Sequence, residues 1–215
     1  TTVNTDRLAI EVYRIGDRGL AATLQNGEFA RNIDSSEVEG IRERTGQKVY
    51  AGELGISSKL NEEVTTAFPV SEALPKLQPG LYLLSAKVLP KKSEGRDARG
   101  QASQWFIVSD LGLTTYSGDD GLHTFVRSLA SAASVGDVNV RLVARNNEIL
   151  ATGTTDARGY VRFDAGLVKG EGGLAPQMLA VETAAGDYAF LDMSSTAFDL
   201  ADRGVKGRDA PGPID

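Results

Sequence analysis

The stretch Val138-Asn-Val-Arg-Leu-Val-Ala-Arg145 alternates apolar side chains with mostly polar ones along its whole length. Val138, Val140 and Leu142 occupy every second position, and successive side chains of a β-strand point to opposite faces of a sheet. An apolar pattern of period two favours a half-buried strand over a helix. We therefore predict a strand here, with these apolar side chains facing a core.

The residues that follow continue the pattern. The turn Asn146–Asn147 leads into a second strand over 148–155. In the next turn, Thr155-Asp-Ala-Arg-Gly159, Asp156 can accept hydrogen bonds from nearby backbone amides, and Gly159 can adopt a positive φ. Further strands are predicted over 160–163, 178–183 and 188–192.

Two more strands precede the stretch, over 113–116 and 122–129. The loop Ser117-Gly-Asp-Asp-Gly121 between them predicts a β-hairpin. The second half of the chain then holds about seven strands, the number typical of a sandwich of two antiparallel sheets.

The first half of the chain follows period two as well. Leu8, Ile10 and Val12 alternate with other residues in a strand that Gly16 to Gly19 are expected to end. Further strands are predicted over 48–54, 63–68, 81–89 and 104–108. Trp105, in the last of these, is expected to anchor the core.

Two short helical segments are predicted between these strands. Asp34-Ser-Ser-Glu37 has the spacing of a capping box at a helix start, and Gly46 stands where a left-handed residue could end that helix. Ser71-Glu-Ala-Leu74 indicates a single turn that Pro75 breaks. The basic, polar stretch 90–100 lacks apolar periodicity and is predicted to be an exposed loop or hairpin tip.

These patterns predict an all-β chain with one or two short helices, folded as two tandem immunoglobulin-like antiparallel β-sandwiches. We place the first domain at 1–109 and the second at 110–202. Residues 203–215 are rich in Gly, Pro and charge, and are expected to be a linker to a further domain. The junction Ser109 to Gly112 is very short, and we expect each half to bury its own core.

Composition limits the classes of function. The 215 residues, 41% of them hydrophobic, suffice for two domains of about 100 residues. A net charge of -6 argues against nucleic-acid binding, which needs clustered Lys and Arg. No apolar run approaches the roughly 20 residues of a membrane-spanning helix. The chain contains no cysteine, which excludes disulfides, thiolate zinc sites and a cysteine nucleophile.

The residues that could form a catalytic, metal-binding or phosphate-binding site are better explained by structural roles. His123 is the only histidine and lies in a predicted strand, so a structural or interface role is favoured over a catalytic base. Asp119-Asp120-Gly121 does not fit a calcium loop and indicates an acidic turn. Gly170-Glu-Gly-Gly173 lacks the Lys-Ser/Thr of a phosphate-binding loop. We therefore predict no catalytic, cofactor-binding or metal-binding residues, no cofactor and no enzymatic activity.

Several short segments of the sequence resemble those of a known protein family. They are Gln104-Trp-Phe-Ile-Val-Ser-Asp-Leu-Gly-Leu113, Ser117-Gly-Asp-Asp-Gly-Leu-His123, Val126-Arg-Ser-Leu129, Leu142-Val-Ala-Arg-Asn-Asn147, Gly172-Gly-Leu-Ala-Pro176 and Gly186-Asp-Tyr-Ala-Phe-Leu191, with weaker matches at Val64-Thr-Thr-Ala67 and Pro79-Gly-Leu-Tyr82. These segments resemble the N-terminal macroglobulin-like domains of bacterial alpha-2-macroglobulins. In the order of domains within the family, they resemble the second and the third. The resemblance is nearly continuous from Gln104 to about Gly207.

The resemblance implies a part of a large inhibitor that traps endopeptidases after they cut a bait segment. It also implies a periplasmic location, with the whole protein anchored to the inner membrane as a lipoprotein. Many members carry a thioester that bonds to the protease. Neither the thioester cysteine nor a lipidated cysteine can lie in this cysteine-free sequence. We carry over no active-site residue from the family.

Two sandwiches joined by the short junction Ser109 to Gly112 are expected to form a rigid arm, and we predict a structural, non-catalytic role for this pair, as a monomer. The expected partners are other domains of the parent chain, proteases met by the full-length protein and a cell-wall synthase of the penicillin-binding class. Tyr116, His123 and Asp110 are expected at the interface between the two domains, with Trp105 mostly buried near it.

Two other classes of function use the same architecture. One is a pair of immunoglobulin-like modules of a cell-surface adhesion or ligand-binding protein, which would need an exposed apolar patch or a calcium-bridged linker. The other is a hydrolase or an enzyme accessory domain. That class would need converging titratable groups, and a pair such as Asp119 and Asp120 could converge only in a bent turn.

Overall fold

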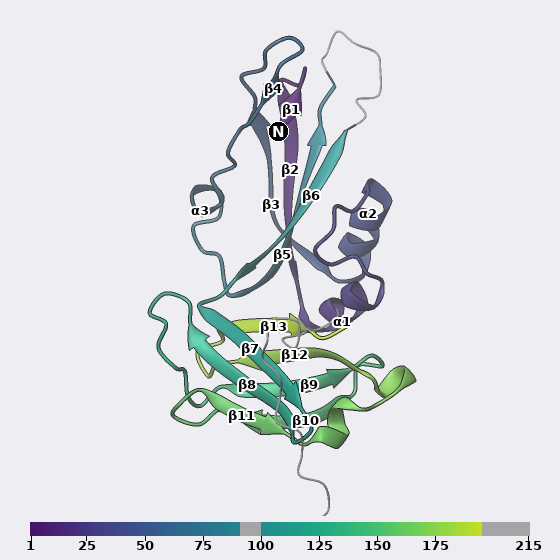
Figure 1. Ribbon diagram of the computed structural model, residues 1–215. Helices are drawn as coiled ribbons and strands as arrows, with labels where there is room; N and C mark the ends of the chain where they lie inside the picture. The colour runs from purple at the N-terminus through teal and green to yellow at the C-terminus, as the bar shows by residue number, and fades with distance from the viewer. Residues whose placement is uncertain (91–99, 195–215) are drawn as a thin grey trace, which may run out of the picture.

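The computed structural model describes residues 1–90 and 100–194 (Figure 1). The strands are β1 (Thr2–Val3), β2 (Arg7–Ile15), β3 (Gly46–Gly55), β4 (Glu63–Val64), β5 (Gly80–Val88), β6 (Gln101–Val108), β7 (Leu111–Gly118), β8 (Gly121–Ser128), β9 (Asn139–Ala144), β10 (Ile149–Thr154), β11 (Tyr160–Phe163), β12 (Pro176–Glu182) and β13 (Tyr188–Asp192). The helices are α1 (Asp17–Gln25), α2 (Ser35–Arg44) and α3 (Val70–Ala73), with 3₁₀ turns η1 (Ala165–Val168) and η2 (Gly172–Leu174).

The N-terminal half is built on one four-stranded antiparallel sheet in the order β3-β2-β5-β6. Its strands alternate as the sequence predicts. Leu8, Ile10 and Val12 of β2 lie in a cluster on one face of the sheet, whereas Tyr13 and Ile15 belong to the cluster on the other face. Both faces of this sheet therefore contribute buried side chains.

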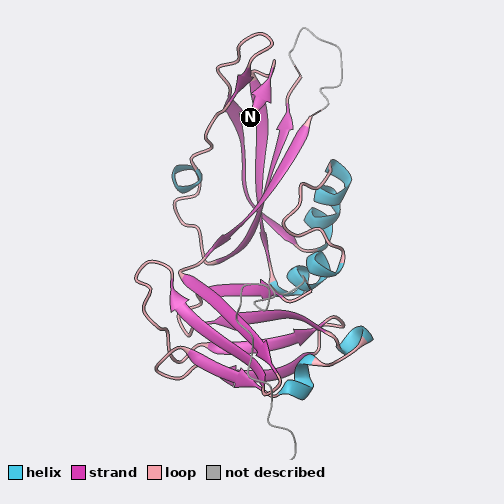
Figure 2. Cartoon of the chain, in the orientation of Figure 1, coloured by secondary structure: helices cyan, strands magenta, loops and turns pink. Residues whose placement is uncertain are grey.

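Different segments cover these two faces. Helices α1 and α2 lie on one side of the sheet, and the long connection that carries α3 lies on the other (Figure 2). Ile56, Phe68 and Leu77 of that connection pack into the cluster around Tyr82. Strands β1 and β4 of this half form a second, two-stranded antiparallel sheet. The layers that cover the four-stranded sheet are helices and an irregular segment, where the second sheet of a sandwich was expected.

The C-terminal half is a sandwich of two antiparallel sheets. A four-stranded sheet, β10-β9-β12-β13, faces a three-stranded sheet, β11-β8-β7. The core between them contains Val140 and Leu142 of β9, Leu122 and Val126 of β8, and Leu179 of β12. The stretch at 138–145 is a strand as predicted, with these side chains facing this core. The expected class, mostly β with antiparallel sheets and a few short helices, is confirmed.

Several local predictions are confirmed. Asp34 and Glu37 form the predicted capping box at the start of α2. The amides of Arg158 and Tyr160 donate to Asp156 at 2.8 and 3.0 Å, and Gly159 has a φ of 72°. The hairpin β7-β8 and the single turn α3 also lie where they were expected.

Other predictions are wrong. Helix α1 was not predicted: the first strand does end before Gly16 as expected, but Gly16 is the N-cap of α1 and Gly19 lies in its first turn. Most of the strand predicted over 63–68 is irregular, because β4 contains only Glu63–Val64. Gly46 does not end α2 in the left-handed region; Thr45 is its C-cap with a φ of -146°. Most of the predicted loop at 90–100 and all of the predicted linker at 203–215 lie outside the described residues.

Candidate functional site

Part of the outer face of the C-terminal four-stranded sheet, over β9, β12 and β13, is buried against the N-terminal half of the chain. In β12, Leu179 and Val181 point into the core of the sandwich, whereas Met178 and Ala180 lie in a second cluster shared with the N-terminal half. All four side chains are nearly inaccessible to solvent. Strand β12 is thus buried on both faces.

The neighbouring strands repeat this division. In β13, Ala189 lies in the sandwich core, while Phe190 and Tyr188 face the N-terminal half. In β9, Leu142 lies in the sandwich core, and the next residue, Val143, faces the N-terminal half. Consequently the sheet presents an apolar outer surface that a free-standing sandwich would expose to water.

The N-terminal half covers this surface with its helix-bearing face. We define the interdomain core as the residues of this shared cluster: Tyr13, Ile15, Leu20, Leu24, Phe29, Ile33, Val38, Ile41, Leu81, Leu83 and Trp105 from the N-terminal half, and Val143, Met178, Ala180, Tyr188 and Phe190 from the C-terminal half. Helix α1 lies directly against β12 (Figure 1).

Aromatic rings at the centre of the interdomain core touch across the boundary. The ring of Phe29 meets the ring of Trp105 edge-on at 5.8 Å and the ring of Phe190 at 5.1 Å. Edge-to-face pairs at such distances stabilise beyond the area they bury. Phe29 therefore joins the edge strand β6 of one domain to β13 of the other.

Helix α1 packs between the four-stranded sheet of the N-terminal half and strand β12 of the C-terminal half. Leu20 and Leu24 stand one turn apart, so they share one face of the helix, and both are buried. Gly19 allows the helix to approach the chain near Thr45, because a Cβ at this position would lie 2.5 Å from Thr45 Cβ. At the helix end, the Gln25 side chain donates to the carbonyl of Arg145 in the other domain.

A polar contact fixes the connection between the domains beside this core. The Asp187 carboxylate, in the turn between β12 and β13, accepts from Ser109 Oγ at 2.8 Å and from the Asp110 amide at 3.0 Å. The Asp110 carboxylate in turn accepts from the amide of Ala130 at 2.8 Å. Hydrogen bonds from Ser128 and from this amide hold the pKa of Asp110 below its usual value. Ser109 and Asp110 of the short junction are thus hydrogen-bonded to the C-terminal domain, at the turn between β12 and β13 and at Ala130 after β8.

The expectation of two independent cores is therefore wrong in one respect. Each half has a cluster of its own, but the interdomain core runs without interruption through both. Trp105 is buried at this interface, at 6% exposure, as predicted. Asp110 hydrogen-bonds to Asp187 and Ala130, which both belong to the C-terminal domain, so these bonds do not cross the interface, contrary to the expectation.

The other two residues expected at the interface lie elsewhere. Tyr116 and His123 face each other near the tip of the β7-β8 hairpin, and Tyr116 is 51% exposed. His123 contacts Tyr160 Oη through Nδ1 at 2.9 Å and Asp120 Oδ1 through Nε2 at 3.0 Å. The hydrogen bond from His123 lowers the pKa of Asp120. Their contacts therefore lie within the C-terminal domain and stiffen the hairpin tip.

The remaining candidates for chemistry do not gather. Within residues 1–90 and 100–194, no group of three or more His, Cys, Asp or Glu residues is placed to hold a metal ion. The glycine-rich segment Gly170–Gly173 ends in the 3₁₀ turn η2, with Gly172 at a φ of 58°. None of the helices in the described part of the chain is both long and apolar enough to cross a membrane.

The interdomain core was missed although the sequence carries a signal for it. A half-buried strand alternates strictly, whereas a strand covered on both faces is apolar without interruption. The run Met178-Leu-Ala-Val181 is of the second kind, and so is Leu142-Val-Ala144. Their additional apolar side chains are the ones that contact the other domain.

Comparison with known proteins places both halves in one family. The model of the bacterial alpha-2-macroglobulin MG2 domain matches residues 1–91, and that of the bacterial alpha-2-macroglobulin MG3 domain matches residues 108–210. The alpha-2-macroglobulin of Escherichia coli K12 is 23% identical over 98% of this chain, and the homologue of Yersinia pestis is 35% identical over 44% of it. The chain spans only 12% and 5% of the length of these relatives.

Solved structures show the same fold. A crystal structure of native E. coli alpha-2-macroglobulin spanning domains NIE-MG1 superposes with a TM-score of 0.69 at 20% identity, covering 90% of this chain and 86% of that one. A trypsin-activated E. coli structure gives 0.69 at 21% identity, covering 94% of this chain and 13% of that one. The expected second and third macroglobulin-like domains are thus confirmed, and the chain belongs to the bacterial alpha-2-macroglobulin family.

Proposed function

We propose that this chain is a rigid, non-catalytic structural arm of an alpha-2-macroglobulin-like endopeptidase inhibitor. The interdomain core is the observation that supports this role. Two domains without a large apolar interface generally move relative to one another, whereas burial of such a surface between them opposes reorientation. Breaking the contact would expose Met178, Phe190 and Leu24 to water, at a cost of roughly 25 cal/mol per Å² of apolar surface.

The chemistry of inhibition is expected elsewhere on the parent protein. A thioester requires a cysteine, and the chain has none. The proposed task of the arm is to hold other segments of the parent at fixed positions. Family membership supports this proposal over a pair of cell-surface adhesion modules.

The partners and the cellular location of the parent protein are likewise proposed from family membership. We expect other domains of the parent chain and trapped proteases as partners, with a penicillin-binding cell-wall synthase as a further candidate. We also expect a periplasmic location with a lipid anchor on the parent.

A protease assay tests the proposed function. The isolated chain is incubated with trypsin and chymotrypsin, in parallel with the full parent protein. We expect the chain to leave both protease activities unchanged and to form no covalent adduct on a denaturing gel. The parent should inhibit cleavage of a protein substrate and shift in mobility. Inhibition or substrate hydrolysis by the chain alone would contradict the proposal.

A further inference from the structure

The side of β2 that faces the connection carrying α3 ends in a charged residue, Arg14. Leu8, Ile10 and Val12 pack under the connection that carries α3, and Arg14 is the next residue on the same side of the strand. Its guanidinium lies under the end of that connection, where Nη2 donates to the carbonyl of Pro79 at 2.9 Å. An arginine that continues an apolar stripe needs a partner for its charge.

That charge has no carboxylate partner among the described residues. Arg14 Nε is buried and has no hydrogen-bond acceptor within the described part of the chain. Glu182 of the C-terminal domain lines a small adjoining pocket with Arg14, but its ion pair is with Arg141, at 3.6 Å. Nε itself is closed to solvent and is not the atom a ligand would contact, but the guanidinium as a whole carries a charge that no described carboxylate pairs with.

The guanidinium borders a pocket of about 550 Å³ between the sheet and the α3 connection. This volume lies within the range of small-ligand sites. Its described lining contains two cations, Arg14 and Lys76, and no acidic residue. Lys76 is exposed and forms no ion pair with the described residues. The pocket is therefore electropositive.

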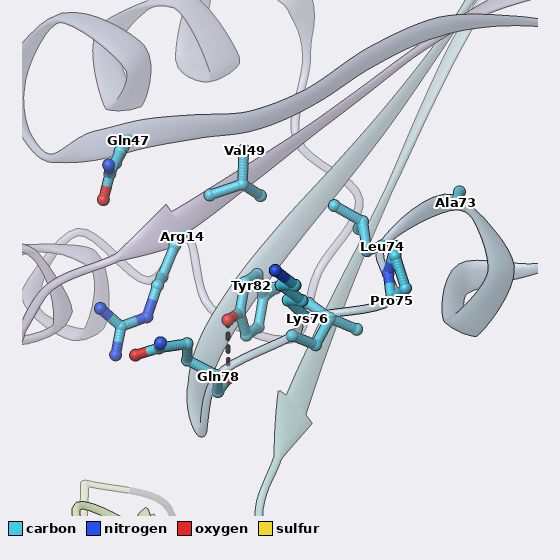
Figure 3. Close-up of a pocket in the computed structure, with 10 residues that line it drawn as sticks. Arg14, Gln47, Val49, Ala73, Leu74, Pro75, Lys76, Gln78 and Tyr82 are labelled. Carbon is cyan, nitrogen blue, oxygen red and sulfur yellow. Dashed lines mark hydrogen bonds between the residues drawn. The ribbon is translucent and has the colours of Figure 1, made fainter.

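The two ends of the pocket differ in character (Figure 3). Arg14, Gln47 and Gln78 gather at one end, while Leu74 and Pro75 lie at the other. The floor is held in place by Tyr82, whose hydroxyl donates to the carbonyl of Gln78 at 2.6 Å. The site thus offers hydrogen-bond donors next to an apolar surface.

Gly80 makes room for this arrangement. It has a φ of 145°, and a Cβ at this position would lie 3.3 Å from Arg14 Nε. Any other residue would therefore be strained there and would press on the guanidinium. The backbone around Pro79 and Gly80 is shaped to accommodate the arginine.

We propose that this pocket binds a carboxylate-bearing ligand with an apolar group beside the carboxylate, such as the free C-terminus of a peptide that ends in a leucine. The carboxylate accepts hydrogen bonds from Arg14, in the charge-assisted manner for which a guanidinium is suited. The apolar group lies against Leu74. Lys76 adds attraction at the rim. This inference does not depend on the proposed structural role of the domain pair.

The test is an NMR titration of the isotope-labelled chain with acetyl-Ala-Ala-Leu, its C-terminal amide and acetyl-leucine. The Arg14 Nε–H signal and the backbone amides of Gln47 and Gln78 report on the site. We expect the tripeptide acid to shift these signals with a Kd on the order of 0.1–1 mM, and the amide to bind at least tenfold more weakly. Equal binding of acetyl-leucine would show that a small organic acid satisfies the same chemistry. Absence of any shift with all three compounds, or equal shifts with acid and amide, would overturn the proposal.

Substitutions locate the binding. Arg14→Gln is expected to abolish the shifts at the other two reporters. Because that variant also loses the bond to Pro79, Lys76→Gln provides a second test that removes only a rim charge, and it should weaken binding several-fold. Lys87→Gln is the matched control, since Lys87 is also exposed on this domain but lies outside the pocket. Unchanged affinity in both Arg14→Gln and Lys76→Gln would overturn the proposal.

Discussion

The ring of Phe29 lies edge-on against the ring of Phe190, with 5.1 Å between their centroids, and the contact crosses from one domain to the other. Phe29 follows helix α1, and Phe190 lies on the outer face of the C-terminal sandwich. The apolar interior of the molecule therefore does not stop at the junction between the domains. The stability of each domain should depend on the other.

Phe190→Ala tests this dependence. Phe190 is 8% exposed, and removing a buried phenyl ring leaves a cavity that costs about 3–5 kcal/mol. We expect the free energy of unfolding to fall by this amount in urea denaturation followed by Trp105 fluorescence. The tryptophan is the only one in the chain and reports from the same cluster.

Ile149→Ala is the control for this measurement. Ile149 lies on the same sheet but is 55% exposed, so its removal should change the unfolding free energy by no more than about 0.5 kcal/mol. A loss at Phe190 as small as the loss at Ile149 would mean that the interdomain core contributes little.

The Asp187 carboxylate should protect the junction from hydrogen exchange. In Asp187→Ala the amide of Asp110 loses its acceptor. We expect this amide to exchange at least tenfold faster, which corresponds to a loss of about 1.4 kcal/mol in the local opening free energy. NMR-detected exchange measures it directly. Asp192→Ala removes a carboxylate that caps the Ser194 turn and, among the described residues, does not bond to the junction, so it should leave Asp110 unchanged. Acceleration in both variants would refute the assignment.

Gly19→Ala should destabilise the chain even though alanine favours helices. The added Cβ would lie 2.5 Å from Thr45 Cβ, so α1 or its neighbour must move, at a cost of about 1–3 kcal/mol. Thermal denaturation should show a lower midpoint. Gly16→Ala is the matched control, because a Cβ there meets nothing within 4 Å. A Gly19→Ala variant as stable as Gly16→Ala would show that α1 does not need this close approach.

The turn at Asp156 should make stability depend on pH in the acid range. The backbone amide of Tyr160, together with the backbone and side chain of Arg158, holds the pKa of Asp156 below its usual value. Because the folded-state pKa is the lower one, the stabilisation is complete above about pH 5 and is lost as the pH falls through the folded-state value. Asp156→Asn should therefore lose stability at pH 7 and resemble the unmodified chain near pH 2. A carboxyl titration midpoint at or above about 3.9 would contradict this assignment.

The sequence predicts the strands well because their information is local. Val140 and Leu142 alternate with outward residues, and a period of two is visible without any knowledge of the partners. The turn at Asp156 and the capping box at Asp34 are equally local, since each is formed by side chains that bond to backbone a few residues away.

The apolar runs in β9 and β12 indicate strands covered on both faces, but the sequence does not show what covers them, because the interdomain core joins residues far apart in the chain. Helix α1 is short, and Gly16 and Gly19 at its start favour a turn, although Leu20, Ala21 and Leu24 suit a helix. Its burial against β12 depends on tertiary packing. Arg14 illustrates the same limit, since only the fold shows that it follows the apolar stripe of β2 to the edge of a pocket.

The distance between the two domains provides the most direct test of the rigid arm. The chain has no cysteine, so Lys87→Cys and Thr152→Cys place two spin labels at exposed strand positions, one in each domain. Pulsed electron paramagnetic resonance of this double variant should give one narrow distance distribution, and adding Phe190→Ala should broaden it. A broad distribution before that substitution, of the kind given by two domains on a flexible tether, would contradict the proposed arm.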